Sequence, residues 1–297
     1  MKSLIKQRLR KLARKIFNIG LLELRGDVTS QFSRSQEIQV LLKQHYKELL
    51  RQNAIPLPTF DEVGFGCHSQ FEEDGILLYI FSLIGTTNKV AVEICAGDGI
   101  QCNTTNLIIN HGWQGFLFDG EQKNVTIGKE FFSRHKDTWL WPPLFNAAWI
   151  TAENVNEILR DAGVSGDIDL LSLDIDGMDY WIWKAIDFIN PRVVVCETQC
   201  AIGPDKALTA PYDPKFTIKT PDHFGASLAA MTKLASEKGY RLVGTHRYGF
   251  NAFFVRDGIA EGLLPAVSVA SCLEHPVAQN AREEKWPKVK DLPWVKV

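Results

Sequence analysis

The sequence lacks the features of several specialised protein classes. Its longest hydrophobic run, GILLYIFSLIG at 75–85, has eleven residues, whereas a membrane-spanning helix needs about 20. Its net charge is only −2, so no overall field draws the chain onto nucleic acid and we expect no nucleic-acid partner. It contains no internal repeat and no low-complexity tract, which argues against repeat architectures. Its length of 297 residues suits one large α/β domain with additions, or two smaller domains.

Cysteine pairs and a secretory signal are missing as well. The six cysteines include no CxxC pair and no regular spacing, and a chain of 297 residues needs no disulfides to stabilise its core. No small-residue cleavage site follows an apolar block near the N-terminus. We therefore expect reduced thiols and a cytoplasmic protein.

The first 24 residues differ from the rest in composition. Seven lysines and arginines precede the first acid, Glu23, and the apolar side chains recur at helical spacing, at Ile5, Leu9, Leu12 and Ile16. Such a basic amphipathic helix can lie on the anionic inner face of a membrane. It can equally pack on its own domain or on a partner subunit of a homo-oligomer. We predict residues 1–60 to be a helical extension, with a second helix near 35–52.

Strands and helices alternate from residue 69 onward. We expect strands at 89–95, 115–119, 144–149, 168–174 and 192–197, and helices at 72–84, 103–111, 152–162 and 225–238. This order predicts an α/β, Rossmann-like fold at 61–260, with a mostly parallel sheet covered by helices on both faces. Two β-rich runs, 240–246 and 250–256, flank a tight turn and predict an antiparallel hairpin at the sheet edge. The polar segment 261–297 is expected to be an irregular extension.

The stretch VEICAGDG at 92–99 reads as the first strand of this sheet and its following turn. Gly97 and Gly99 allow a ligand to approach the backbone, and Asn103 can cap the next helix. The acid in the strand part of the stretch, Glu93, would repel a pyrophosphate and favours a ligand with a cationic part. A second acid, Asp119, ends the next strand, where a carboxylate usually binds ribose hydroxyls. A ligand with an amine, a sulfonium and a ribose fits: S-adenosylmethionine.

The chain resembles a known family at these residues. VEICAGDG is similar to the first motif of class I methyltransferases, Glu/Asp-x-Gly-x-Gly-x-Gly, and the wider set resembles the FkbM-type branch over roughly 65–257: SQFEEDGIL, VEICAGDGIQCNTTNLIINHGW, DLLSLDIDGMDYWIWKAI and GFNAFFVR. One departure is Cys95, which stands at the first glycine and cannot take positive φ cheaply.

The resemblance implies roles for individual residues at the cofactor. It implies that Glu93 holds the turn and the methionine amine, and that the segment around Gln70 touches the amino-acid end. The implied cofactor-binding set is Gln70, Glu93, Cys95, Gly97, Gly99, Asn103, Asp119, Gly120, Ala148, Trp149 and Asp174.

Two further acids follow the fourth strand, in LLSLDIDGMD. Asp174 and Asp176 are spaced to face the same side, and Glu197 ends the next strand beside them. An alcohol acceptor needs a base or a metal, because it is about as weakly acidic as water, with a pKa of ~15.7. The acids can act as bases, bind acceptor hydroxyls or hold Mg²⁺. His246, at the hairpin, is a further candidate base, or a packed strand residue.

The leading hypothesis is an S-adenosylmethionine-dependent O-methyltransferase acting on a small hydroxylated molecule or glycan. One alternative is a metal-dependent glycosyltransferase that uses Asp174 and Asp176 as a D-x-D pair. The other is a non-catalytic Rossmann-like binding module, which Cys95 at a glycine position favours.

Overall fold

The computed structural model describes residues 35–53 and 55–297. The basic segment at 1–24, predicted to be an amphipathic helix, lies outside the described residues. The chain divides into two compact units, 1–45 and 46–297. The described part of the first unit is the beginning of helix α2 (Ser35–Arg51), so the second unit carries the remaining fold.

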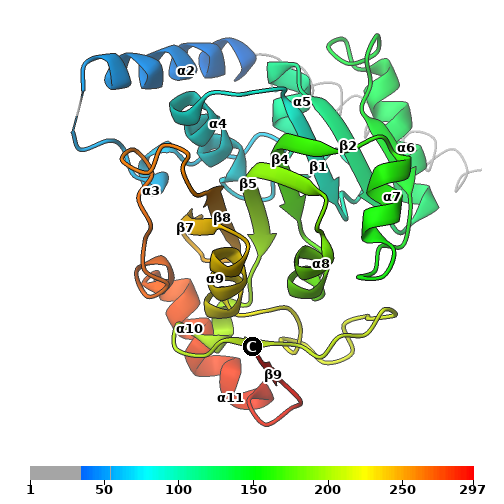
Figure 1. Cartoon of the computed structure of the whole chain (residues 1–297), viewed down its shortest axis with the longest axis vertical. Helices are drawn as coiled ribbons and strands as arrows, with labels where there is room; N and C mark the ends of the chain where they lie inside the picture. The colour runs from blue at the N-terminus through cyan, green and yellow to red at the C-terminus, as the bar shows by residue number, and fades with distance from the viewer. Residues whose placement is uncertain (1–34, 54) are drawn as a thin grey trace, which may run out of the picture. The chain divides into compact units, whose positions relative to one another are not determined.

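A seven-stranded sheet forms the centre of the second unit (Figure 1). Its strand order is β3-β2-β1-β4-β5-β8-β7, and every neighbouring pair is parallel except the two that involve β8. The strands are β1 (Val90–Ile94), β2 (Gln114–Asp119), β3 (Leu144–Ala147), β4 (Gly166–Leu173), β5 (Ile189–Glu197), β7 (Tyr240–Thr245) and β8 (Asn251–Arg256). The predicted fold class, including the antiparallel hairpin at the edge, is confirmed.

Helices cover both faces of the sheet. Successive residues of a strand point to opposite faces, so each strand packs against helices on both sides. Val92 and Ile94 pack in a buried cluster with side chains of α7, α8 and α9. On the other face, Ser172 of β4 bonds Asn103, which precedes α5, and Asn251 of β8 bonds Glu73 of α4. The helices are α3 (Phe60–Val63), α4 (Glu73–Ile84), α5 (Thr105–His111), α6 (Gln122–Arg134), α7 (Val155–Asp161), α8 (Asp179–Ala185) and α9 (Leu228–Glu237).

The C-terminal segment is more regular than predicted. It contains the short helix η2 (Ser271–Leu273), α10 (Pro276–Glu284), α11 (Trp286–Val289) and β9 (Val295–Lys296), which pairs with β6 (Leu208–Thr209). Another short helix, η1 (Cys200–Ile202), follows β5. The irregular extension was therefore a wrong prediction. Its prolines do not prevent helices, because Pro276 and Pro287 lie in the first turn of α10 and α11, where an amide donor is not needed.

The spacing of Ser69 and Glu72 ahead of α4 is that of a capping box, but the structure forms none there. Ser69 exchanges hydrogen bonds with Asp74 instead: its amide donates to the carboxylate at 2.8 Å and its hydroxyl accepts from the Asp74 amide at 3.2 Å. Glu72 instead pairs with Arg247 on the hairpin turn. The actual capping box opens α3, where Glu62 accepts hydrogen bonds from the amide and the hydroxyl of Thr59.

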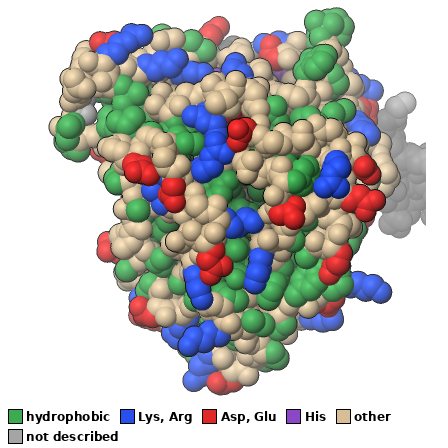
Figure 2. All heavy atoms as spheres, in the orientation of Figure 1, with side chains coloured by type: hydrophobic (Ala, Val, Ile, Leu, Met, Phe, Trp, Pro, Cys, Tyr) green, Lys and Arg blue, Asp and Glu red, His purple; other side chains and the backbone are tan. Residues whose placement is uncertain are grey.

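The surface mixes both signs of charge. Figure 2 shows acidic and basic side chains interspersed over one face. Among the residues that the structure describes, no helix combines the length and the apolar character needed to span a bilayer.

Candidate functional site

The sheet places its switch point between β1 and β4. From β1 the chain continues to β2 and β3 on one side and then crosses to β4 on the other. Ligands of open α/β sheets bind beyond the carboxyl ends of the strands at such a point. The two strand ends are close here, since the Asp174 amide donates to the Ile94 carbonyl at 3.4 Å.

The turn after β1 is left-handed at three positions. Cys95, Gly97 and Gly99 have φ angles of +68°, +58° and +70°. Cys95 therefore adopts a backbone conformation that favours glycine, although its Cβ makes this conformation costly. Its exposed side chain lies at a cavity beside the turn. The turn itself is fixed by a hydrogen bond from the Gly97 amide to Asp119 at 2.9 Å.

Glu93 is 2% exposed and belongs to this turn rather than to a cavity. One carboxylate oxygen accepts from the Asn103 amide and, at 3.4 Å, from the Ser172 hydroxyl. The other accepts from the amide and the hydroxyl of Thr104. A carboxylate has about four acceptor positions, and all four are taken here. Glu93 thus holds the turn as predicted, whereas the predicted contact with a ligand amine finds no free acceptor position.

Asp119 lies at the end of β2 and ties two loops together. One of its oxygens accepts from the Glu121 amide and from Asn124, at 2.9 and 3.0 Å, while the other accepts only from Gly97 among the residues that the structure describes. The second oxygen therefore retains an acceptor position. Asp119 is 5% exposed and lines the neighbouring cavity.

This first cavity has a volume of about 370 Å³ and brings several predicted residues together. Its lining includes five of them: Cys95, Asp119, Gly120, Ala148 and Trp149. The remaining predicted cofactor residues do not line it, namely Gln70, Glu93, Gly97, Gly99, Asn103 and Asp174. Gln70 is exposed to solvent and precedes α4.

Sequence analysis missed the loop 211–218, which forms the opposite wall of the cavity. Tyr212, Pro214 and Phe216 of this loop line the cavity. The indole of Trp149 donates to the Pro214 carbonyl at 2.7 Å, and the Ala152 amide donates to the Tyr212 hydroxyl at 3.0 Å. No periodic pattern in the loop identifies it, although its aromatic residues are a weak signal.

Three carboxylates gather beside the cavity, as predicted from their strand ends. Asp174, Asp176 and Glu197 each offer an oxygen, and these oxygens lie within 4.8 Å of one another. Asp176 also lines the cavity. The turn that carries Asp174 and Asp176 is held by Asp179, whose carboxylate accepts from the amides of Ile175 and Gly177 at 2.9 and 3.3 Å.

The electrostatics of the cluster follow from its burial and its single sign of charge. Burial, and then the neighbouring carboxylates Asp179 and Asp176, raise the pKa of Asp174 well above its usual range. Burial, and then the neighbouring carboxylate of Asp174, also raise the pKa of Glu197 well above its usual range. Carboxyl groups with raised pKa values are better bases than ordinary ones.

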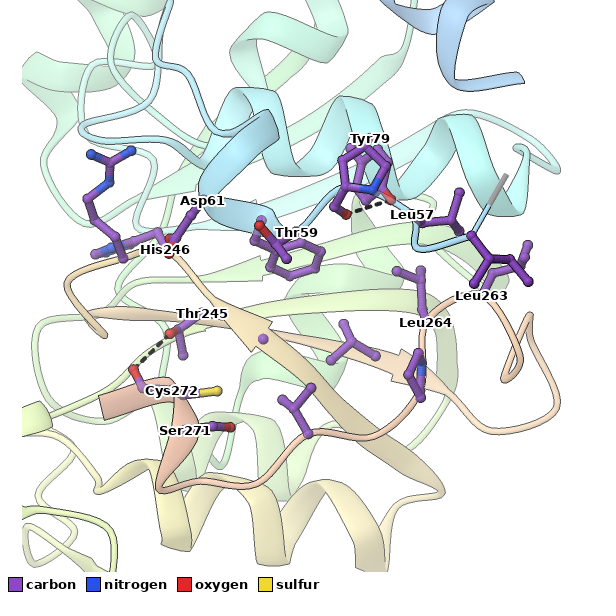
Figure 3. Close-up of a pocket in the computed structure, with 18 of the residues that line it drawn as sticks. Leu57, Thr59, Asp61, Tyr79, Thr245, His246, Leu263, Leu264, Ser271 and Cys272 are labelled. Atoms are coloured by element: carbon purple, nitrogen blue, oxygen red, sulfur yellow. Dashed lines mark hydrogen bonds between the residues drawn. The ribbon is translucent and has the colours of Figure 1, made fainter. Parts of the chain in front are cut away.

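His246 lies at a different cavity from the one that contains Asp176. This second cavity has a volume of about 810 Å³ and runs along β7 (Figure 3). The imidazole is 0% exposed and packs against Phe71, Tyr248 and Phe250. Its Nδ1 accepts from the Tyr248 amide at 3.0 Å, and Nε2 faces Glu73 at 3.6 Å. Burial lowers its pKa, and its contacts are those of a packed strand residue.

None of the known family models matches this chain, and no curated protein matches it in sequence. The resemblance to the FkbM-type branch therefore stays a prediction.

Several solved structures are similar to the chain. Magnesium protoporphyrin IX methyltransferase from Synechocystis PCC 6803 with bound S-adenosylmethionine is 13% identical, with 62% of this chain and 78% of that chain covered and a TM-score of 0.38. An S-adenosylmethionine-dependent methyltransferase from Clostridium acetobutylicum ATCC 824 is 9% identical (61% and 89% covered, TM-score 0.40). The N-terminal domain of EvdMO1 with bound S-adenosylhomocysteine is 13% identical (72% and 93% covered, TM-score 0.40). At these identities and TM-scores the likeness concerns the fold and carries no argument about activity.

Proposed function

We propose that this chain is an S-adenosylmethionine-dependent methyltransferase that methylates a hydroxyl oxygen, for example of a saccharide. The observation that carries the proposal is the position of the 370 Å³ cavity at the switch point of the sheet, with Asp176 shared between its lining and the acid cluster. A methyl donor in the cavity and an acceptor on the acids would therefore be neighbours.

The cavity offers suitable contacts for the adenosyl part of the cofactor. The oxygen of Asp119 that bonds Gly97 retains an acceptor position for a ribose hydroxyl. Trp149 and Phe216 present aromatic side chains, and Ile150 and Met178 present apolar ones, to a flat adenine ring. Cys95 also lines the cavity, and the preceding residue, Ile94, accepts a hydrogen bond from the Asp174 amide, so the sulfonium could reach the acceptor near this turn.

Methyl transfer needs little covalent chemistry from the protein. The acceptor oxygen attacks the methyl carbon in line, a C–O bond forms, the C–S bond breaks, and its electron pair neutralises the sulfonium. The proton of the hydroxyl would pass to the carboxylate of Asp174 or Asp176, which lie together in the acid cluster. A thioether and a methyl ether are the products.

Calorimetry with S-adenosylmethionine and S-adenosylhomocysteine tests the cofactor assignment. Trp149 and Trp139 are both largely exposed, and only Trp149 lines the cavity. We expect Trp149→Ala to weaken binding about tenfold or more, as loss of a stacking contact does, and the matched control Trp139→Ala to leave it unchanged. Equal effects of the two substitutions, or no binding by the wild type at millimolar ligand, would refute the proposal.

Transfer of a labelled methyl group to a panel of mono- and oligosaccharides tests the reaction. Asn tolerates the positive φ of +48° at position 176, so Asp176→Asn should fold and bind the cofactor normally but lose transfer. Cofactor binding without transfer to any acceptor would favour a binding module instead. Metal-dependent binding of nucleotide sugars without S-adenosylmethionine binding would favour a glycosyltransferase.

A further inference from the structure

The acid cluster contains oxygen atoms that nothing in the described part of the chain satisfies. Oε2 of Glu197 is buried and has no hydrogen-bond partner, and the same is true of Oδ1 of Asn251. No salt bridge with a lysine, arginine or histidine among the described residues includes Asp174, Asp176 or Glu197. Buried polar oxygens usually have a partner, so this group of unpaired oxygens indicates a missing ligand.

Asn251 joins the cluster through the antiparallel strand β8. It is the register partner of Glu197, and directly opposite residues on paired strands project to the same face of the sheet. Its amide nitrogen donates to Glu73 at 2.9 Å. Because a carboxylate only accepts, this bond fixes the orientation of the amide, and the carbonyl oxygen is the atom left unpaired. At 4% exposure, that oxygen has little access to bulk water.

We propose that Asp174, Asp176, Glu197 and Asn251 form a divalent-cation site that takes a hard cation such as Mg²⁺. Carboxylate and amide oxygens are the ligands that such cations prefer, and Mg²⁺ commonly keeps several waters beside one or two carboxylates. Asp176 is exposed at the cavity, so the open positions of the cation would face the acceptor. The cation also offsets the repulsion of three carboxylates within 4.8 Å.

The role of the cation rests on the proposed function, whereas its binding does not. A hydroxyl bound to a divalent cation loses its proton more readily, as metal-bound water does. The site would therefore select acceptors with a hydroxyl that can enter the coordination sphere. Glu197 and Asn251 would position the cation, and Asp174 and Asp176 would hold it at the cavity.

Binding of Mn²⁺ to the full chain, measured by electron paramagnetic resonance and by calorimetry, tests the site without any acceptor or cofactor. We expect the wild type to bind Mn²⁺ and Mg²⁺ to compete for the same site. Glu197→Gln and Asp176→Asn should each weaken binding about tenfold or more. The matched control Glu157→Gln, at an exposed position on α7, should leave binding unchanged.

Two further measurements separate a lost site from a lost fold and from a failed reaction. Asn251→Leu is compared with the wild type by thermal unfolding with and without Mg²⁺, and we expect the Mg²⁺-dependent increase in Tm to disappear. No Mn²⁺ binding at millimolar concentration, or binding that Glu197→Gln and Asp176→Asn leave unchanged, would overturn the site. Methyl transfer at full rate in a chelator would overturn the role of the cation while sustaining the proposed function, whereas Mn²⁺ binding without methyl transfer would sustain the site alone.

Discussion

Cys95 should store backbone strain that glycine would release. With φ at +68°, its Cβ occupies a conformation that costs an L-residue about 1–2 kcal/mol. Glycine removes this cost but increases the freedom of the unfolded chain, which costs about 0.5–1 kcal/mol. We therefore expect Cys95→Gly to raise the free energy of unfolding by about 0.5–1 kcal/mol, or Tm by about 1–4 °C.

Cys95→Ala is the matched control, because it removes the same thiol and keeps the Cβ. The side chain of Cys95 is exposed at the cavity, so neither substitution removes much packing. Urea and thermal unfolding under reducing conditions should show a gain for glycine and none for alanine. If Cys95→Gly is no more stable than Cys95→Ala, the inference of backbone strain at position 95 is refuted. Both substitutions remove the thiol, so a change in cofactor affinity that they share would give the contribution of the thiol to cofactor binding.

Two other expectations concern buried charges away from the cavity. Burial raises the pKa of Asp74 from 3.8 to about 6, so the native state binds a proton more tightly than the unfolded state and stability falls as pH rises from about 4 to 6. Asp74→Asn should remove this slope, worth about 3 kcal/mol, in urea unfolding across that range. Arg192→Met leaves the buried Asp169 without its ion pair at 2.9 Å and should cost about 3–5 kcal/mol. The same substitution at Arg256, in an exposed pair, should cost under about 1 kcal/mol.

Periodicity and residue type predicted the sheet and its acidic edge. Apolar runs of strand length alternated with helical patterns, and parallel strands end at one edge. Asp174 and Glu197 could therefore be placed together from sequence, because Asp174 directly follows β4 and Glu197 is the last residue of the neighbouring strand β5. Asn251 was missed, since it reaches the same edge at the beginning of an antiparallel strand, and its pairing with β5 is a long-range contact.

Elements without a strong apolar pattern were not predictable. Helix α6 was missed because it buries few residues, namely Val125, Gly128 and Phe132, and only two of these have a side chain. The loop 211–218 contacts Trp149 from more than 60 positions away in the chain, so no local pattern marks it as a wall of the cavity. The helices of the C-terminal segment begin at prolines, which reads as irregular structure when only composition is considered.

Sequence cannot show which hydrogen-bond donors a carboxylate has in the folded protein. These donors divide the acids of this site into two groups. Glu93, Asp119 and Asp179 accept backbone amides, so they shape the turns after the strands. Asp174, Asp176 and Glu197 accept no hydrogen bond from the described residues, and the turn held by Asp179 presents Asp176 to the cavity. Hydrogen bonds from backbone amides stabilise the carboxylates of the first group. Partly buried carboxylates without such bonds raise the free energy of the native state, and a bound ligand would lower it again. The binding chemistry of this edge is therefore concentrated in the unpaired group.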